Sequence, residues 1–135
     1  MDFQLNELNY LAVLVGGIIY MGFGAIYFSP ILFGNKWVEL NKVEFNEGTN
    51  NTLSYVGSAL VAMLSSLLMA VVVHLTGADG VLSGLTVGLL IGLFVSLAYL
   101  KNTLFGLTNK KVFFIAIGDH LIIFTVLGIL HGLWQ

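Results

Sequence analysis

Residues 80–96 read GVLSGLTVGLLIGLFVS, and they hold the pattern that decides how this chain folds. Glycine recurs at every fourth position among bulky apolar residues, and a serine takes the next place: Gly80, Gly84, Gly88, Gly92 and Ser96. Each glycine destabilises a helix by about 1 kcal/mol relative to alanine, so this glycine row needs a compensating contact. In a bilayer, small residues let two helix backbones approach closely. The glycine row, a glycine-zipper pattern, therefore predicts close packing against another membrane helix.

The composition of the 135-residue chain fits a membrane environment. Hydrophobic residues make up 58% and charged residues only 9%, whereas a soluble domain carries about 25% charged residues. Five lysines, no arginine and seven carboxylates give a net charge of −2, which argues against a nucleic-acid partner because such binding needs clustered cations. The absence of cysteine excludes disulfides and thiolate metal sites. We expect the lipid bilayer as the main partner, and no cofactor or metal ion.

Four apolar stretches are long enough to cross a bilayer, which takes about 20 residues in a helix. They cover residues 10–28 with a continuation to about 33, then 53–75, 81–100 and 112–134. Helices are expected because the bilayer interior offers backbone groups no partners, and the stretches lack the alternation of a β-barrel. The predicted fold is all-α: one membrane-embedded domain over residues 1–135, a bundle of four transmembrane helices with antiparallel neighbours and short loops.

The lysines predict the orientation of these spans. All five lie in the first and third connections: Lys36, Lys42, Lys101, Lys110 and Lys111. Because short cytoplasmic loops carry an excess of Lys and Arg, these two connections are expected in the cytoplasm. Both termini are then expected outside the cytoplasm.

Other spans also carry small residues at four-residue spacing. The second span has the row Ser54, Ser58, Ala62, Ser66 and Ala70, and the fourth has Gly128 and Gly132. Since a five-residue turn joins the second span to the glycine row, the two are expected to form an antiparallel hairpin. Two uses of the glycine row stay open. It packs helices within one chain, or it joins chains in a homo-oligomer or with other membrane protein subunits.

Asp119 is the only acid inside a predicted span, and His120 follows it. At 1.5 Å per residue it lies about 10 Å inside the fourth span. Polar residues at a similar depth in the other spans are Tyr27, Ser58 and Ser96. An ionisable residue within a membrane is a functional-site hypothesis by default. Either Asp119 and His120 handle a proton or orient a ligand, or Asp119 is a neutral, hydrogen-bonded residue that helps the helices to pack.

His74 and His131 end two parallel spans at the outer side, and two histidines on different helices are a pattern of haem ligation. A histidine near a membrane interface more often anchors its helix. No phosphate-binding loop, metal-spaced cluster or Ser-His-Asp order occurs in the sequence, so we expect the protein not to be an enzyme.

The first loop and the residue before it leave alternatives open. Trp37, Leu40 and Val43 fit one side of a short interfacial helix, whereas Val43 and Phe45 fit an extended segment. Pro30 either disrupts the first span or begins a short helix with Ser29 as its N-cap. In both cases the chain changes direction there.

The stretch YFSPILFGNKW (27–37) resembles the aromatic-Ser-Pro-x-x-Phe-Gly-x-x-Trp signature of a bacterial integral membrane family known as domain of unknown function 1761. The resemblance covers nearly the whole chain. Matching positions include Ser29, Pro30, Gly34, Trp37, Asn102, Gly118, His120, Gly128 and Trp134. It implies four spans and a bacterial inner membrane, and it supplies no activity. Members of that family tend to carry an aromatic residue where Asp119 stands, so the resemblance does not make Asp119 a shared catalytic residue.

The leading interpretation is a small non-enzymatic membrane protein that assembles through small-residue rows, as a homo-oligomer or an accessory subunit of a larger complex. The alternative is a minimal transporter or channel for protons or small solutes that uses Asp119 and His120. A haem-bearing electron carrier is the third reading.

Overall fold

The computed structural model describes residues 3–29, 31–41, 52–106 and 109–135. These residues form five α-helices and a short 3-10 helix, and they contain no strand. The helices are η1 (Leu5–Glu7), α1 (Tyr10–Tyr27), α2 (Gly34–Asn41), α3 (Thr52–Thr76), α4 (Val81–Leu104) and α5 (Lys110–Leu133). Of these, α1, α3, α4 and α5 are long and apolar enough to cross a membrane, with mean hydropathies of 1.8 to 2.4. The all-α class and the four apolar helices predicted from the sequence are confirmed.

Local side-chain and backbone contacts set the helix ends. The side chain of Asn9 accepts a hydrogen bond from the Ala12 amide at the start of α1, and Asn109 accepts one from Lys111 at the start of α5. The first helix ends at Tyr27, before the continuation to residue 33 that the sequence allowed. In contrast, α4 continues beyond residue 100, the predicted end of the third span, to Leu104. Gly106 follows with a φ of 74°, a left-handed conformation that terminates helices.

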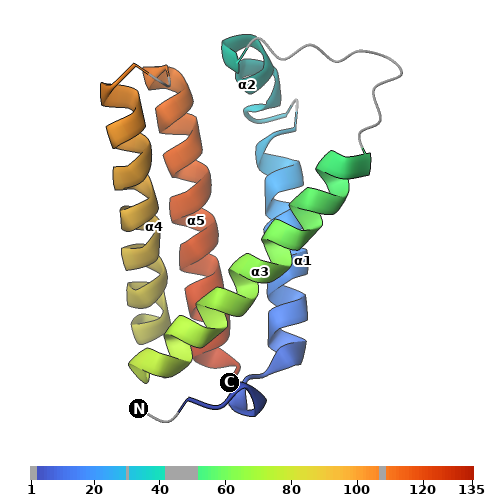
Figure 1. The fold of residues 1–135 in the computed structure, drawn as a ribbon, viewed down its shortest axis with the longest axis vertical. Helices are drawn as coiled ribbons and strands as arrows, with labels where there is room; N and C mark the ends of the chain where they lie inside the picture. The colour runs from blue at the N-terminus through green and yellow to red at the C-terminus, as the bar shows by residue number, and fades with distance from the viewer. Residues whose placement is uncertain (1–2, 30, 42–51, 107–108) are drawn as a thin grey trace.

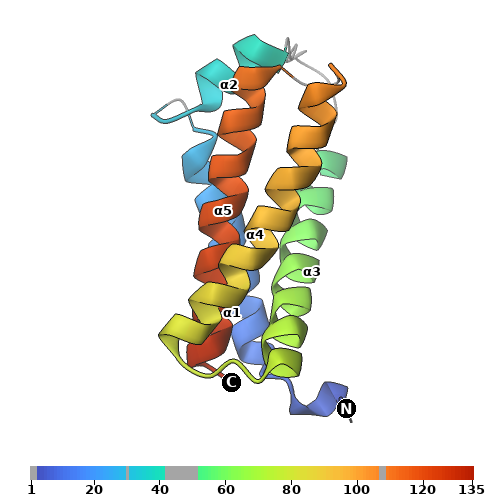
Figure 2. The ribbon, with the colours of Figure 1, turned by 90° about the vertical axis from the view of Figure 1, so that its left-hand side faces the viewer.

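The helices form a hairpin of α4 and α5, with α1 beside α5 and α3 running obliquely across α1 (Figures 1 and 2). Both chain ends lie at one end of the bundle, here called the terminal end (Figure 1). The opposite end, the α2 end, holds α2, the end of α4 and the start of α5 (Figure 1). As α3 runs from the terminal end towards the α2 end, it diverges from α5 (Figure 1).

The glycine row packs against α5. Gly84, Gly88 and Gly92 are buried, and a Cβ atom added at each of them would meet α5. The atoms met belong to the backbone of Gly128 for Gly84, to that of Phe124 and Thr125 for Gly88, and to Leu121 for Gly92. The same contact is seen from α5, because a Cβ atom added at Gly128 or Gly132 would meet the backbone of the glycine row. Two helix backbones therefore touch over the part of the hairpin that runs from Gly84 to Gly92 on α4.

Gly80, at the start of the row, has a different role. Its φ of 92° is a conformation that favours glycine, and a Cβ atom there would meet no other atom within 4 Å. Its amide donates a hydrogen bond to the Gly132 carbonyl at 2.9 Å. Gly80 thus turns the chain into α4 and ties that turn to the end of α5.

The expected hairpin between the second span and the glycine row is wrong. Helices α3 and α4 contact each other only slightly, whereas Ser66 and Ala70 of α3 pack on α1 against Gly16 and Val13. A short turn brings two helices together but does not decide which of their faces meet. Gly128 and Gly132 repeat the four-residue spacing of the glycine row and supply the complementary face. Of the remaining small residues on α3, Ala62 is fully buried while Ser54 and Ser58 are exposed.

Helix α2 agrees with one of the two structures that the sequence allowed for the first loop, a short helix or an extended segment. Trp37 and Leu40 lie on α2, so a short helix is confirmed up to residue 41. Val43 and Phe45, on which the extended reading depended, lie outside the described residues.

Large apolar side chains cover the outer faces of the spanning helices. On α3 these are Leu60, Leu64 and Leu68, and on α4 they are Leu90, Phe94 and Leu97, all exposed. The core that the chain does bury lies toward the terminal end, where Met69 and Val73 of α3 meet Ala78 and Leu127. Apolar surface outside and a thin core inside suit a protein whose solvent is lipid.

Candidate functional site

A cleft opens between α1, α3 and α5 in the half of the bundle nearer to the α2 end. It arises because the first two turns of α3 lie apart from α5, and it has a volume of about 880 Å³. Tyr20 and Gly24 of α1 line it, together with Gly57 and Ser58 of α3 and Asp119 of α5. Asp119 is the only charged residue among those that line it. The volume and the mostly apolar walls are typical of a small-molecule site.

The Asp119 side chain is 16% exposed, and within the described part of the chain its carboxylate accepts no hydrogen bond. His120 Nδ1 lies 3.8 Å from Asp119 Oδ2, which is too far for a hydrogen bond. That nitrogen instead donates its hydrogen to the Ala116 carbonyl at 2.7 Å. The carboxylate is therefore left to face the cleft.

The structure keeps His120 within ion-pair distance of Asp119, but the two side chains face different parts of the bundle. The His120 ring lies against α4 and the next turn of α5, 5.2 Å from the Tyr99 ring and 5.9 Å from the Phe124 ring between centroids. His120 does not line the cleft. Neighbouring residues on a helix point about 100° apart, so the packing that buries one of these side chains against α4 turns the other toward α1 and α3.

The other polar residues expected at this depth are mostly engaged elsewhere. The Tyr27 hydroxyl donates to the Ile115 carbonyl at 2.6 Å, in the space that Gly118 leaves by having no side chain. The Ser96 hydroxyl donates to the Gly92 carbonyl of its own helix at 2.8 Å. Only Ser58 shares the cleft with Asp119. Tyr20, which also lines it, was missed because one aromatic residue in an apolar span carries no distinguishing signal.

The YFSPILFGNKW stretch builds the turn between α1 and α2. The Phe33 amide donates to the Tyr27 carbonyl at 3.0 Å, and the Gly34 amide donates to the Ser29 carbonyl at 2.9 Å. A side chain at position 34 would collide with the Phe28 carbonyl, which explains the glycine. The Trp37 ring then packs edge-on against Phe28 at 5.1 Å. These signature residues therefore shape the turn between α1 and α2, and Phe28 also lines the cleft.

The family signature includes two further positions. Pro30 lies outside the described residues, and Asn102 is exposed near the end of α4. The family described as "Protein of unknown function (DUF1761)" matches residues 11–132. The chain belongs to this family. No curated protein and no solved structure matches the chain. The function of this DUF1761 protein must therefore be argued from the chemistry of its own side chains.

A second polar cluster of the DUF1761 chain joins three helices near the terminal end. Ser66 of α3 and His131 of α5 are buried, with 0% and 3% of their surface exposed. The Ser66 hydroxyl donates to the Val13 carbonyl of α1 at 2.8 Å. His131 Nε2, 3.1 Å from the same oxygen, then donates its hydrogen to Ser66. Because Ser66 gives its hydrogen to a carbonyl and not to the histidine, the pair is not a base-activated nucleophile.

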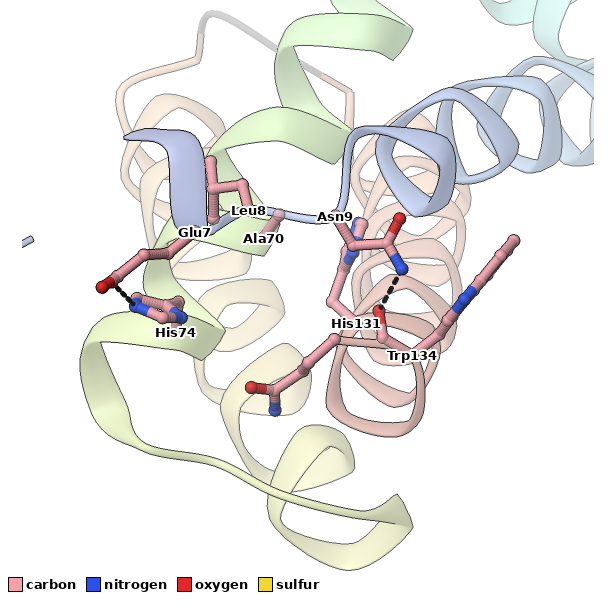
Figure 3. A pocket seen from close by; sticks show the side chains of 8 residues that line it. Glu7, Leu8, Asn9, Ala70, His74, His131 and Trp134 are labelled. Carbon is pink, nitrogen blue, oxygen red and sulfur yellow. Dashed lines mark hydrogen bonds and ion pairs between the residues drawn. The ribbon is translucent and has the colours of Figure 1, made fainter. Parts of the chain in front are cut away.

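His74 and His131, expected at a similar depth, line the same small cavity at the terminal end (Figure 3). The cavity measures about 20 Å³, which suits one water molecule. His74 Nε2 pairs with Glu7 Oε2 at 3.0 Å, and Asn9 of the same cavity donates to the Trp134 carbonyl (Figure 3). Each histidine thus has a hydrogen-bond partner at Nε2, and the space of about 20 Å³ that they share cannot hold a haem.

Proposed function

We propose that this DUF1761 protein is a non-enzymatic transport protein of the bacterial inner membrane that holds a proton or a small solute at Asp119. One observation carries the proposal: a carboxylate stands in a cleft at membrane depth with no hydrogen-bond partner in the described residues. A carboxylate at the centre of a membrane helix is unfavourable by about 3 kcal/mol. A group with only a packing role would be expected to offset that energy with a bond to a neighbouring helix.

The contacts of the glycine row favour transport over assembly. That row was the feature that pointed to a homo-oligomer or to a larger complex, and its three buried glycines are in contact with α5 of the same chain. The Asp119 cleft, by contrast, is not filled by another helix of the described chain. We therefore propose transport as the function and assign no partner subunit to the glycine row.

We also propose that both termini lie outside the cytoplasm. Four of the five lysines fall in the described residues, and their helices place them at the α2 end: Lys36, Lys101, Lys110 and Lys111. The described residues of the terminal end contain no lysine. With the positive end in the cytoplasm, the Asp119 cleft opens in the cytoplasmic half of the bundle.

Reporter fusions test this orientation. Alkaline phosphatase, which is active only outside the cytoplasm, is expected to be active when fused after Gln135 and inactive when inserted after Gly106. A fluorescent protein that matures in the cytoplasm should give the opposite pattern at the same two sites. Enzyme activity and fluorescence per fusion protein are the measurements. Active phosphatase after Gly106 would reverse the proposed topology.

Asp119→Asn tests the transport proposal, because it removes the charge and keeps the shape of the side chain. The purified protein is placed in liposomes with an imposed pH gradient, and a pH-sensitive dye measures proton flux. We expect wild type to transport protons, either without added solute or when a small solute is added outside the liposomes. We expect the variant to lower that flux at least about tenfold, which corresponds to about 1.4 kcal/mol.

A matched substitution provides the control for this experiment. Asp79, in the turn before α4, is exposed and lies outside the spanning helices. Asp79→Asn makes the same chemical change there and should leave the flux unchanged. Equal proton flux in wild type and Asp119→Asn under every solute condition would refute the transport proposal.

A further inference from the structure

We infer that the ligand of the Asp119 cleft is a lipid-soluble organic cation, such as an amine with an apolar body. This inference rests on the proposed function, because it names the class of solute that Asp119 holds.

The charge of the cleft is complementary to a cation. Asp119 is the one charged residue that lines it, and no lysine or histidine does. The Ser58 hydroxyl has given its hydrogen to the Ser54 carbonyl at 2.7 Å, so its oxygen is left with lone pairs. A positively charged ammonium group would satisfy both acceptors, whereas an anion would meet a carboxylate of the same sign.

The aromatic walls add a second contact that is specific for cations. Tyr20 and Phe28 from the α1 side and Tyr55 from α3 all line the cleft. The face of an aromatic ring attracts a cation by about 0.5–2 kcal/mol, more when water is excluded. The same rings and the neighbouring aliphatic side chains offer an apolar surface to the body of the ligand.

The position of the cleft selects a ligand that dissolves in lipid. Its walls come from spanning helices, and the divergence of α3 from α5 opens it at the depth of the bilayer (Figure 1). A solute that enters between these helices arrives from the lipid, so it needs an apolar body. The volume of about 880 Å³ lies within the range of sites for drug-sized molecules, about 300–1,000 Å³.

A second copy of the chain is a poorer occupant. Its helices would need to bring a cation to Asp119, and the described lysines lie at the α2 end. Lys111, on the same helix as Asp119, is separated from it by about 12 Å of helical rise. A lipid tail would fill the cleft but would leave the carboxylate without a partner.

Binding of the cation is coupled to a proton. We expect the Asp119 carboxyl of the free protein to carry a proton, because a charge at this depth of the bilayer is unfavourable. The organic cation forms an ion pair with the carboxylate, and the proton leaves to water, so the charge in the cleft is unchanged. Affinity is then expected to rise about tenfold per pH unit while the free carboxyl is protonated. The other titratable groups around it are His120 and the phenols of Tyr20, Tyr27 and Tyr99, and phenols do not titrate near neutral pH.

Three ligands with one body and different head groups test the inference. We would measure phenylbutylammonium, phenylbutanol and phenylbutyrate by equilibrium dialysis against the protein in phosphatidylcholine nanodiscs, with empty nanodiscs subtracted. The ammonium compound is expected to bind at least about tenfold more tightly than the alcohol, because only it pairs with the carboxylate. Phenylbutyrate is expected to bind more weakly than the alcohol. Equal binding of all three would indicate an apolar lipid site and would overturn the inference.

Two glycines of α1 supply matched variants that do not depend on Asp119. A Cβ atom at Gly24 or at Gly22 would meet nothing within 4 Å, so a larger side chain can begin at either position without a clash at Cβ. Gly24 lines the cleft and Gly22 does not. Gly24→Leu is expected to abolish binding of the ammonium compound, and Gly22→Leu should preserve it. Retained binding in Gly24→Leu would place the ligand elsewhere and would overturn the inference.

Asp119→Asn separates this inference from the proposed function. The variant is expected to bind the ammonium compound and the alcohol equally weakly. If wild type shows proton flux that depends on Asp119 but no preference for the ammonium compound, the ligand class is wrong and the transport proposal stands. If the preference is present and the flux is absent, the ligand class stands and the transport proposal falls.

Discussion

Gly88→Ala is expected to destabilise the folded protein by about 2 kcal/mol or more, in the range of overpacked cores. The added methyl group would meet the Phe124 carbonyl oxygen and would lie 2.9 Å from the carbon of that carbonyl and from Thr125 Cα. These are backbone atoms and cannot rotate away, so α4 and α5 would have to separate. The separation would also weaken the contacts of Gly84 and Gly92 on the same row. Unfolding in mixed micelles at increasing denaturing-detergent fraction measures the change.

Gly22→Ala is the matched control because Gly22 is exposed in a spanning helix and a Cβ atom there meets nothing within 4 Å. Alanine is the better helix former by about 1 kcal/mol, so this variant should be as stable as wild type or more stable. The two substitutions are chemically identical and differ only in what the methyl group meets. Because the glycine row packs within one chain, the loss in Gly88→Ala should not depend on protein concentration. Equal stability of the two variants would contradict backbone contact between α4 and α5.

The four spans could be predicted because a bilayer imposes strict conditions on length and hydropathy. The partner of the glycine row could not, since the spacing of small residues shows that a helix has a flat face and not which helix covers it. Rows in the second and fourth spans were equally suitable by spacing, and both spans adjoin the glycine row in sequence. Which span packs on the glycine row depends on the size of the residues that face it. Gly128 and Gly132 can approach a backbone more closely than Ser66 or Ala62.

Asp119 stood out in the sequence because it is a lone acid in an apolar stretch, and Ser58, expected at a similar depth, lines the same cleft. The direction of its side chain was not predictable. Helix rotation decides whether Asp119 or His120 faces the cleft, and the rotation of α5 is fixed by Gly128 and Gly132 several turns away. The contact between Ser66 and His131 was missed for a related reason. It joins residues 65 positions apart, so it depends on how α3 and α5 pack and not on a local pattern.

Ser66→Ala is expected to destabilise the protein by about 1–2 kcal/mol, the range for a buried hydrogen-bonding group that loses its partner in a membrane protein. The substitution removes the acceptor for His131 Nε2 and the donor to the Val13 carbonyl at once. His131 is 3% exposed, so water would not easily replace the lost partner. The same detergent unfolding assay gives the change in the free energy of unfolding.

Ser96→Ala is the matched control, because the Ser96 hydroxyl bonds only the Gly92 carbonyl of its own helix. Its loss should change the free energy of unfolding by less than about 0.5 kcal/mol. A double-mutant cycle with His131→Phe isolates the contact, since Ser66→Ala should then cause a smaller loss than in wild type. An unaltered loss would mean that Ser66 acts through its fit against Gly16 and not through the histidine. The three helices would then be held at this point by shape alone.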